Sequence, residues 1–428
     1  MLQFFLSLLA FLLVLSLLLL RRNGNLIVPM WAVFLIGSIF CLVTGLVGPV
    51  QAVLSIDPQV MIFLFGMFTI SKGLEISGDL ESFSQWLMNR ARSPFQLSLL
   101  LSLGLGLASS VIMNDSLVIM GTPILLSYSK KTGTNPLPLL YTLAFAVTLG
   151  SAMTPMGNPQ NMLIATESGM RAPLLEFVYY LFPFSVVSLL VLSVFMYRDI
   201  KNQHKSPDIR NFEVVRDYRL SRISRISLVT AIALMLISDM LQLAHLFTGF
   251  TLSYASLAGA LVLLVFSDRR REIIVKTDWK ILVMFAGLFI FTQGLYSGGL
   301  VSAMYPALNF LSGGNLLIFI TVSSLLLSQV LSNVPLTALL LPLFKTLIPT
   351  GGSAALYWSL FAASSTLAGA LTLLGAASNL IVANEAERNG IRFSYLAFAK
   401  RGIPLTIICT LLLLLLVYIE LHSYPITS

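Results

Sequence analysis

Charged residues are scarce in this chain. Only 10% of its 428 residues are Asp, Glu, Lys or Arg, while 57% are hydrophobic; a soluble domain carries about 25% charged residues. The alternation of apolar and polar residues that a membrane β-barrel requires is also missing, whereas apolar runs long enough for a spanning helix recur along the whole length. We therefore expect an all-α, polytopic protein whose solvent is the lipid bilayer.

Side chains that carry out covalent chemistry are few. The chain has two cysteines and three histidines. Cys41 and Cys409 both lie within apolar runs, where packing is a more common role than redox or metal chemistry. The histidines are not paired at metal-ligand spacing, and nucleophile-elbow, dinucleotide and Walker motifs are missing. We expect no enzyme, no cofactor and no metal site, and any ATP drive would require a separate ATPase subunit.

The net charge of +8 does not indicate nucleic acid as a partner, because Lys and Arg are confined to short connections between apolar runs. The largest polar stretch, residues 198–225, holds eight basic and four acidic residues. Cytoplasmic connections of membrane proteins are enriched in Lys and Arg. We therefore place this stretch in the cytoplasm and the chain in the plasma (inner) membrane, surrounded by lipid.

Ten spanning helices put the other basic connections on the same side as residues 198–225 and leave both termini outside. They are expected at residues 3–20, 27–47, 58–76, 137–166, 174–197, 226–247, 250–267, 279–297, 354–384 and 403–420. Residues 95–128 begin and end beside cytoplasmic basic residues, so they form either two short crossings or a re-entrant hairpin. A carboxylate at mid-bilayer costs about 2.5 to 3.5 kcal/mol, and Asp115 therefore favours a hairpin with a hydrated tip.

The two halves of the chain share a series of landmarks. The pairs are Asn114 and Asn333, Pro123 and Pro342, Gly157 and Gly375, Asn161 and Asn379, and Glu167 and Glu385. The members of each pair are 218 or 219 residues apart, for example 333 − 114 = 219 and 379 − 161 = 218. An odd crossing between the halves turns the second copy over, so the pattern predicts two inverted-topology repeats.

This repeat predicts the organisation of the chain. The expected parts are an N-terminal transmembrane helix (1–26), a first repeat (27–197), the cytoplasmic loop (198–225), a linking transmembrane helix (226–249) and a second repeat (250–428). Each repeat is expected to hold one re-entrant hairpin and one broken helix. These are hairpin 95–128 and helix 137–166 in the first repeat, and hairpin 313–347 and helix 354–384 in the second.

Two helix breaks are expected to form the functional site together with the hairpin tips. Residues 150–161 hold two prolines, two glycines and two asparagines, and a proline inside a helix removes a donor and clashes with the preceding turn. Unwound peptide groups and helix N-termini can bind ions. The predicted substrate and ion site comprises Asn114, Asp115, Ser116, Thr154, Gly157, Asn158, Asn161, Asn333, Thr337, Gly375, Ser378 and Asn379. Asp115 is the expected proton or cation carrier.

At these residues the chain resembles the ion transporter superfamily, most nearly its arsenical-pump and sodium/proton-antiporter-like anion permease branch, and more distantly the divalent anion/sodium symporters. The strings that carry the resemblance are NDSLVIMGTPILL from Asn114, GSAMTPMGNPQNMLIA from Gly150, SNVPLTALLLPL from Ser332 and GAASNLIVA from Gly375. The resemblance implies two oppositely directed hairpins, substrate and coupling ion at their tips and at the neighbouring breaks, elevator-type movement and a homodimer.

The first tip departs from the dicarboxylate-carrying relatives, because Met113, Asn114 and Asp115 stand where they have Ser-Asn-Thr. An acid after the tip asparagine is similar to the arsenite/antimonite efflux branch, in which coupling is to protons. Arsenite is largely uncharged at neutral pH, which suits a site that no Lys or Arg is expected to approach. We expect a secondary active transporter of a small anion or metalloid oxyacid. A sodium/proton antiporter, a sodium-coupled di/tricarboxylate or sulfate transporter and a channel are the alternatives.

Overall fold

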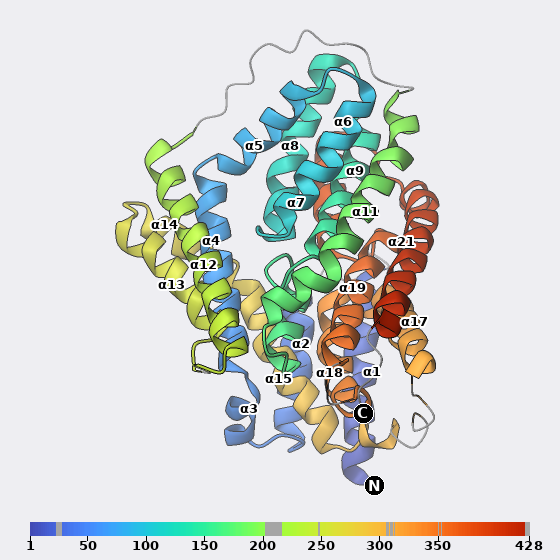
Figure 1. The fold of residues 1–428 in the computed structure, drawn as a ribbon. Coiled ribbons are helices and arrows are strands. Elements are labelled where there is room, and N and C mark those ends of the chain that lie inside the picture. The colour runs from blue at the N-terminus through green and yellow to red at the C-terminus, as the bar shows by residue number, and fades with distance from the viewer. Residues whose placement is uncertain are drawn as a thin grey trace.

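The computed structural model describes residues 1–22, 28–201, 216–246, 249–304, 308, 311, 313–349, 351 and 353–423. Within these ranges every regular element is a helix, and most of the long helices run roughly parallel to one axis (Figure 1). Eight of the described helices are long and apolar enough to cross a membrane. The expected all-α, polytopic membrane protein is confirmed.

Seven of the eight long apolar helices fall on predicted spans. They are α1 (Leu2–Arg22), α4 (Pro58–Ile76), α11 (Pro173–Lys201), α12 (Tyr218–Leu243), α15 (Trp279–Ser297), α19 (Ala354–Leu371) and α21 (Tyr395–Ser423). Two other predicted spans are the shorter apolar helices α2 (Met30–Val43) and α13 (Leu252–Phe266). The predicted span 137–166 is divided into α9 (Pro136–Ser151) and α10 (Pro159–Glu167), and α19 is followed by α20 (Ala377–Arg388) after a break of its own.

Between α4 and α9 the chain turns back on itself in what we name the first hairpin, residues 94–132. Helix α5 (Asp79–Arg90) leads into it from α4. One arm is α6 (Pro94–Leu100), the π-helical turn η1 (Leu101–Leu105) and α7 (Gly106–Ser109), and the returning arm is α8 (Asn114–Thr132). The outgoing arm begins and the returning arm ends at the end of the molecule that holds α5, opposite the N-terminus, and the turn between them lies near the middle (Figure 1).

The second hairpin, residues 313–347, pairs α17 (Gly313–Leu331) with α18 (Asn333–Leu347). Helix α17 is the eighth long apolar helix, and its 19 residues extend about 28 Å at 1.5 Å per residue. It reaches its turn at Ser332, from which α18 runs back beside it. The two hairpins therefore have the same design, with an asparagine as the first residue of each returning arm.

Short polar caps explain where four of these helices begin. Four helices start with an Asp, Ser or Asn whose side chain accepts a backbone N–H of the first turn, followed by a proline that has no N–H to satisfy. These pairs are Asp57 and Pro58, Ser93 and Pro94, Asn135 and Pro136, and Asn158 and Pro159. The caps fix the starting points of α4, α6, α9 and α10 from local sequence alone.

Helices of the two halves pack on each other in reciprocal pairs. Helix α2 packs on α15 and α4 packs on α13, while α10 contacts α18 and α8 contacts α20. Small residues allow the close approach: a Cβ atom on Gly66 of α4 would lie 2.7 Å from the backbone carbonyl carbon of Ser256 in α13. Each half thus completes its packing with elements of the other.

The boundaries of the predicted cytoplasmic loop, 198–225, differ from the structure. Helix α11 continues to Lys201, and α12 begins at Tyr218, eight residues before the predicted start at 226. The Asp217 side chain caps α12 by accepting the N–H of Leu220 at 3.0 Å. Arg219, Arg222 and Arg225 therefore lie on helix, where long basic side chains can reach the membrane surface. Lys205 and Arg210, like residues 23–26 of the predicted N-terminal part, lie outside the described residues.

Candidate functional site

A cavity of about 170 Å³ lies where the hairpin tips meet the helix breaks. Its lining consists of Met30, Trp31, Asn114, Asp115, Pro159, Gln160, Lys280, Ile281, Met284, Ser332, Asn333, Val334, Ala376 and Ala377. These residues lie at the starts of six helices, namely α2, α8, α10, α15, α18 and α20, in the first turn or at the cap residue before it, except for Met284 in the second turn of α15. Free N–H groups at helix N-termini carry partial positive charge, so the cavity favours oxygen atoms and negative charge.

The tip of the first hairpin is held against the first break. The backbone N–H of Asn114 donates to the carbonyl of Gly157 at 3.1 Å, and the Asn114 side-chain oxygen accepts the N–H of Asp115 at 2.9 Å. Asp115 lies in the first turn of α8 and lines the cavity. It is the only acid among the described lining residues, and the helix N-terminus on which it stands stabilises a carboxylate.

The tip of the second hairpin is held against the second break in a related way. With its amide oriented so that the nitrogen faces the surrounding acceptors, Asn333 donates to the carbonyls of Ser365 at 3.0 Å and Gly375 at 2.8 Å, and it also bonds the Ser328 hydroxyl. Asn114 therefore contacts Gly157, and Asn333 contacts Gly375. These two glycines are themselves 218 residues apart. Ser332 has a φ of 69°, a left-handed conformation that is costly for a serine and that occurs preferentially at functional sites.

The first break, residues 152–158, is closed by two asparagines. Asn158 caps α10 by accepting the N–H of Asn161 at 2.8 Å, and its amide donates to Ser151 and Thr366. The Asn161 amide donates to the carbonyls of Ser151 at 3.1 Å and Thr154 at 3.1 Å. Its oxygen accepts the hydroxyl of Thr366 at 3.2 Å. These side chains replace the helical hydrogen bonds that the prolines remove.

The second break repeats these contacts with one asparagine. The Asn379 amide donates to the carbonyls of Gly369 at 2.6 Å and Thr372 at 3.4 Å. Gly369 and Thr372 correspond to Ser151 and Thr154 at the same offset, since 369 − 151 = 218 and 372 − 154 = 218. The amides of Asn161 and Asn379 therefore bond carbonyls at positions that are also 218 residues apart.

Backbone crowding explains the glycines of the first break. A Cβ atom on Gly150 of α9 would lie 1.9 Å from the carbonyl oxygen of Gly106 in the first hairpin, and one on Gly157 would lie 2.3 Å from the carbonyl oxygen of Ser151. No side-chain adjustment can relieve a clash with backbone. Glycine is required because the hairpin and the break are in direct main-chain contact.

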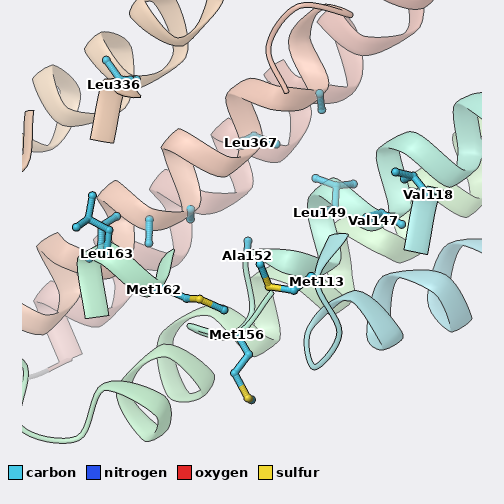
Figure 2. Packing of buried hydrophobic residues seen from close by; sticks show 14 of the residues in the cluster. Met113, Val118, Val147, Leu149, Ala152, Met156, Met162, Leu163, Leu336 and Leu367 are labelled. Atoms are coloured by element: carbon cyan, nitrogen blue, oxygen red, sulfur yellow. The ribbon is translucent and has the colours of Figure 1, made fainter. Parts of the chain in front are cut away.

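Methionine side chains fill the space around this break. Figure 2 shows Met113, Met156 and Met162 close to Ala152, where the first hairpin tip meets the break. All three are buried, and methionine packs well in irregular spaces because its side chain is unbranched and flexible. The first break is therefore packed by apolar side chains that can adapt in shape.

Of the twelve predicted site residues, Asn114, Asp115 and Asn333 line the cavity. The remaining nine are buried and lie behind its wall, in the breaks or within the first five residues of α8, α10, α18 and α20. They are Ser116, Thr154, Gly157, Asn158, Asn161, Thr337, Gly375, Ser378 and Asn379. Thr154 shows their role, because its hydroxyl bonds the Ser110 carbonyl of the hairpin. The structure brings all twelve residues into one region, where three line the cavity and nine support the residues that form its wall.

Sequence reasoning missed the wall that α2 and α15 contribute. Met30 and Trp31 belong to α2, and Lys280, Ile281 and Met284 belong to α15. The expectation that no Lys or Arg approaches the tips is wrong for Lys280, because the first turn of α15 packs beside them. The available signal was a basic residue at the second position of an apolar span. Gln160, between the proline and asparagine of the first break, was also missed.

We expect Asn161→Ala to impair transport by loosening the first break. The substitution leaves buried carbonyls without donors, at about 1 to 3 kcal/mol each, so we expect a loss of about 2 kcal/mol or more in stability and a large loss of transport rate. Thermal melting of the detergent-solubilised protein and vesicle transport test this. Thr166→Ala on the same helix removes only a local helix contact and serves as control. Wild-type transport by Asn161→Ala would contradict a role for the break.

Comparison with known proteins agrees with this architecture. A family model described as citrate transporter matches residues 11–363. A 46 kDa membrane protein of Mycobacterium leprae is 28% identical over 371 residues, which cover 82% of this chain and 84% of that protein. A silicon efflux transporter of rice, Oryza sativa subsp. japonica, is 26% identical over 439 residues, covering 88% of this chain and 90% of that protein.

Among solved structures, the YdaH transporter of Alcanivorax borkumensis aligns with a TM-score of 0.60 over 87% of this chain and 86% of that chain, at 16% sequence identity. At this identity the likeness concerns the fold alone. The resemblance to the ion transporter superfamily and the multi-pass membrane location are confirmed. The family model covers most of the chain, and the protein therefore belongs to the citrate transporter family of membrane transporters.

Proposed function

We propose that the protein is a secondary active transporter that exports a small metalloid oxyacid of the arsenite/antimonite type in exchange for protons, with Asp115 as the proton carrier. The observation that carries this proposal is one cavity surrounded by six helix N-termini and containing one carboxylate. Its volume, about 170 Å³, equals roughly five to six water molecules and lies below the 300 to 1,000 Å³ of pockets for larger organic ligands. A small solute suits it.

The charge balance of the cavity favours a weak acid over a carboxylate polyanion. A di- or tricarboxylate needs cationic partners, yet Lys280 is the only described basic residue in the lining, and it is exposed. Asp115 would repel a polyanion while ionised. A neutral oxyacid presents O–H donors to the Asp115 carboxylate and oxygen acceptors to the helix N-termini. The silicon efflux transporter among the relatives supports a metalloid cargo.

Competition at Asp115 gives a physical basis for proton exchange. The ionised carboxylate accepts hydrogen bonds from the substrate hydroxyls, and protonation removes part of this acceptor capacity. Proton and substrate then weaken each other's binding by the same factor, because coupling between two ligands is reciprocal. A carrier that crosses with either the proton or the substrate bound is an antiporter.

The cavity has one expected side of access. Its wall includes the first turns of α2 and α15, and the basic segments that precede them in sequence are Arg21 with Arg22 and residues 269–271. Basic connections mark the cytoplasmic side. We infer an inward-facing arrangement with two re-entrant hairpins in inverted repeats, with the domain boundaries stated above, apart from the longer α11 and α12.

Transport into everted membrane vesicles tests the function. We expect an imposed acid interior to drive arsenite accumulation, because exported cargo enters an everted vesicle as protons leave it. Sulfate, citrate and sodium are compared under the same gradient. Citrate or sulfate uptake would contradict the metalloid assignment, and arsenite that equilibrates without accumulating would indicate a channel.

Sodium coupling is the second candidate, and a separate observation favours it. The buried oxygens Thr337 Oγ1, Ser378 Oγ and Asn379 Oδ1 have no hydrogen-bond partner within the described part of the chain. They lie on the second hairpin and at the second break, where side-chain and unwound backbone oxygens can coordinate a sodium ion. Sodium-dependent arsenite transport without a pH gradient, or proton-driven sodium uptake, would support this candidate instead.

A further inference from the structure

A second polar cavity lies apart from the transport site, at the start of α12. Its volume is about 570 Å³, and it is lined by Arg216, Tyr218, Ser221, Arg222, Arg225 and Ile226. We name it the arginine pocket. None of its lining residues belongs to the transport cavity, so its function is separate from the transport reaction.

Ion pairs and hydrogen bonds hold the floor of the arginine pocket together. Arg216 and Arg225 both bond the same oxygen of the buried Asp79 carboxylate, at 2.6 and 2.7 Å. The Ser221 hydroxyl donates to that oxygen at 2.9 Å and accepts from both guanidinium groups. Two guanidinium groups thus pair with one carboxylate, and Arg222 adds a third basic side chain to the lining, which leaves an excess of positive charge.

Arg222 places one of these positive charges where a ligand can reach it. Within the described ranges no carboxylate pairs with it, and the residue is exposed. A guanidinium group presents planar N–H donors that match the oxygens of a phosphate in two parallel hydrogen bonds. A pocket with a fixed basic floor and a free arginine at its edge is suited to a phosphate group.

The exposed apolar surface of α12 that follows Arg222 indicates which kind of phosphate compound would fit. Ile226, Val229, Ile237 and Met240 are 49%, 64%, 48% and 60% exposed. At 3.6 residues per turn they lie on one face of α12, and Arg222 continues that face one turn before Ile226. Since α12 is long and apolar enough to span the membrane, this stripe faces lipid. The phosphate would lie directly above the acyl region.

We propose that the arginine pocket binds the headgroup phosphate of an anionic phospholipid, with an acyl chain lying along the stripe from Ile226 to Met240. The exposed Tyr218 ring lies at the pocket edge, as aromatic side chains do at membrane interfaces. Asp79 begins α5, the helix that joins α4 to the first hairpin. The lipid therefore occupies the junction where α12 is tied to the base of that hairpin.

Lipid binding to the purified full-length protein tests this proposal without a transport assay. The protein is placed in nanodiscs of phosphatidylcholine with or without phosphatidylglycerol, and retained lipid is measured by native mass spectrometry after release. We expect phosphatidylglycerol to be retained by the wild type and its apparent affinity to fall about fivefold in Arg222→Gln, the effect of about 1 kcal/mol for one basic residue at an anionic surface. Arg222→Lys should keep part of it.

A matched control separates the pocket from general surface charge. Arg271→Gln removes another exposed arginine, on α14 (Arg270–Lys276) outside the pocket, and we expect this variant to retain phosphatidylglycerol as the wild type does. Equal loss in both variants, or no loss in Arg222→Gln, would overturn the proposal. Displacement of the lipid by inorganic phosphate at similar concentration would also overturn it, because the pocket would then bind a soluble anion.

Discussion

Asp115→Asn is expected to abolish proton-driven accumulation of substrate, with a loss of about 100-fold, the upper range of coupling between two ligands. Asparagine has nearly the same shape as aspartate, but it cannot take up or release a proton. It can still accept a hydrogen bond in the cavity that Asp115 lines. We therefore expect substrate exchange without a pH gradient to persist in part while uphill transport stops. Counterflow and gradient-driven uptake in the same everted vesicles measure the two processes.

Glu387→Gln is the matched control for this experiment. Glu387 lies on α20, a helix whose first turn also lines the cavity, but its own side chain is exposed and outside the lining. Its replacement should leave both processes at wild-type rates. Gradient-driven accumulation retained by Asp115→Asn would exclude Asp115 as the carrier and leave the sodium candidate as the better explanation.

Gly150→Ala is expected to destabilise the protein severely, by about 3 kcal/mol or more, because the added methyl group would lie 1.9 Å from the Gly106 carbonyl oxygen. Overpacking costs about 1 to 3 kcal/mol where side chains can yield, and here the opposing atoms are backbone. The first hairpin would have to move away from α9, which separates its tip from the break. Thermal melting followed by size-exclusion chromatography should show a large downward shift or loss of folded protein.

Gly121→Ala is the matched control, since Gly121 lies on the returning arm of the same hairpin. A Cβ atom there would lie 3.1 Å from a terminal methyl carbon of Leu143, a flexible side chain. We expect a change within about 1 kcal/mol, because the small steric cost is offset by the higher helix propensity of alanine. A similar large loss in both variants would show that the hairpin tolerates no added volume and that main-chain contact at Gly150 is not special.

Several features of the fold could be read from local sequence. Apolar runs located the spans because the bilayer fixes the length of a helix that crosses it. The cluster of Pro155, Gly157 and Asn158 located the first break, because proline and glycine act through their own backbone geometry. The start of α12 was misplaced because basic residues were assigned to the loop, although a capped helix can carry them into the interface.

By itself, the sequence determined that the chain crosses a membrane many times, where its helices break, and that Asn114, Asp115 and Asn333 stand at turns within apolar segments. Only the tertiary structure decided which side chains line the cavity, placing Asn161 and Asn379 behind its wall and Lys280 on it. The reason is that helix starts depend on neighbouring residues, whereas the meeting of six helix N-termini depends on packing between residues more than 200 positions apart, such as Asn158 and Thr366. The residues adjacent in sequence do not reveal which distant residues pack together.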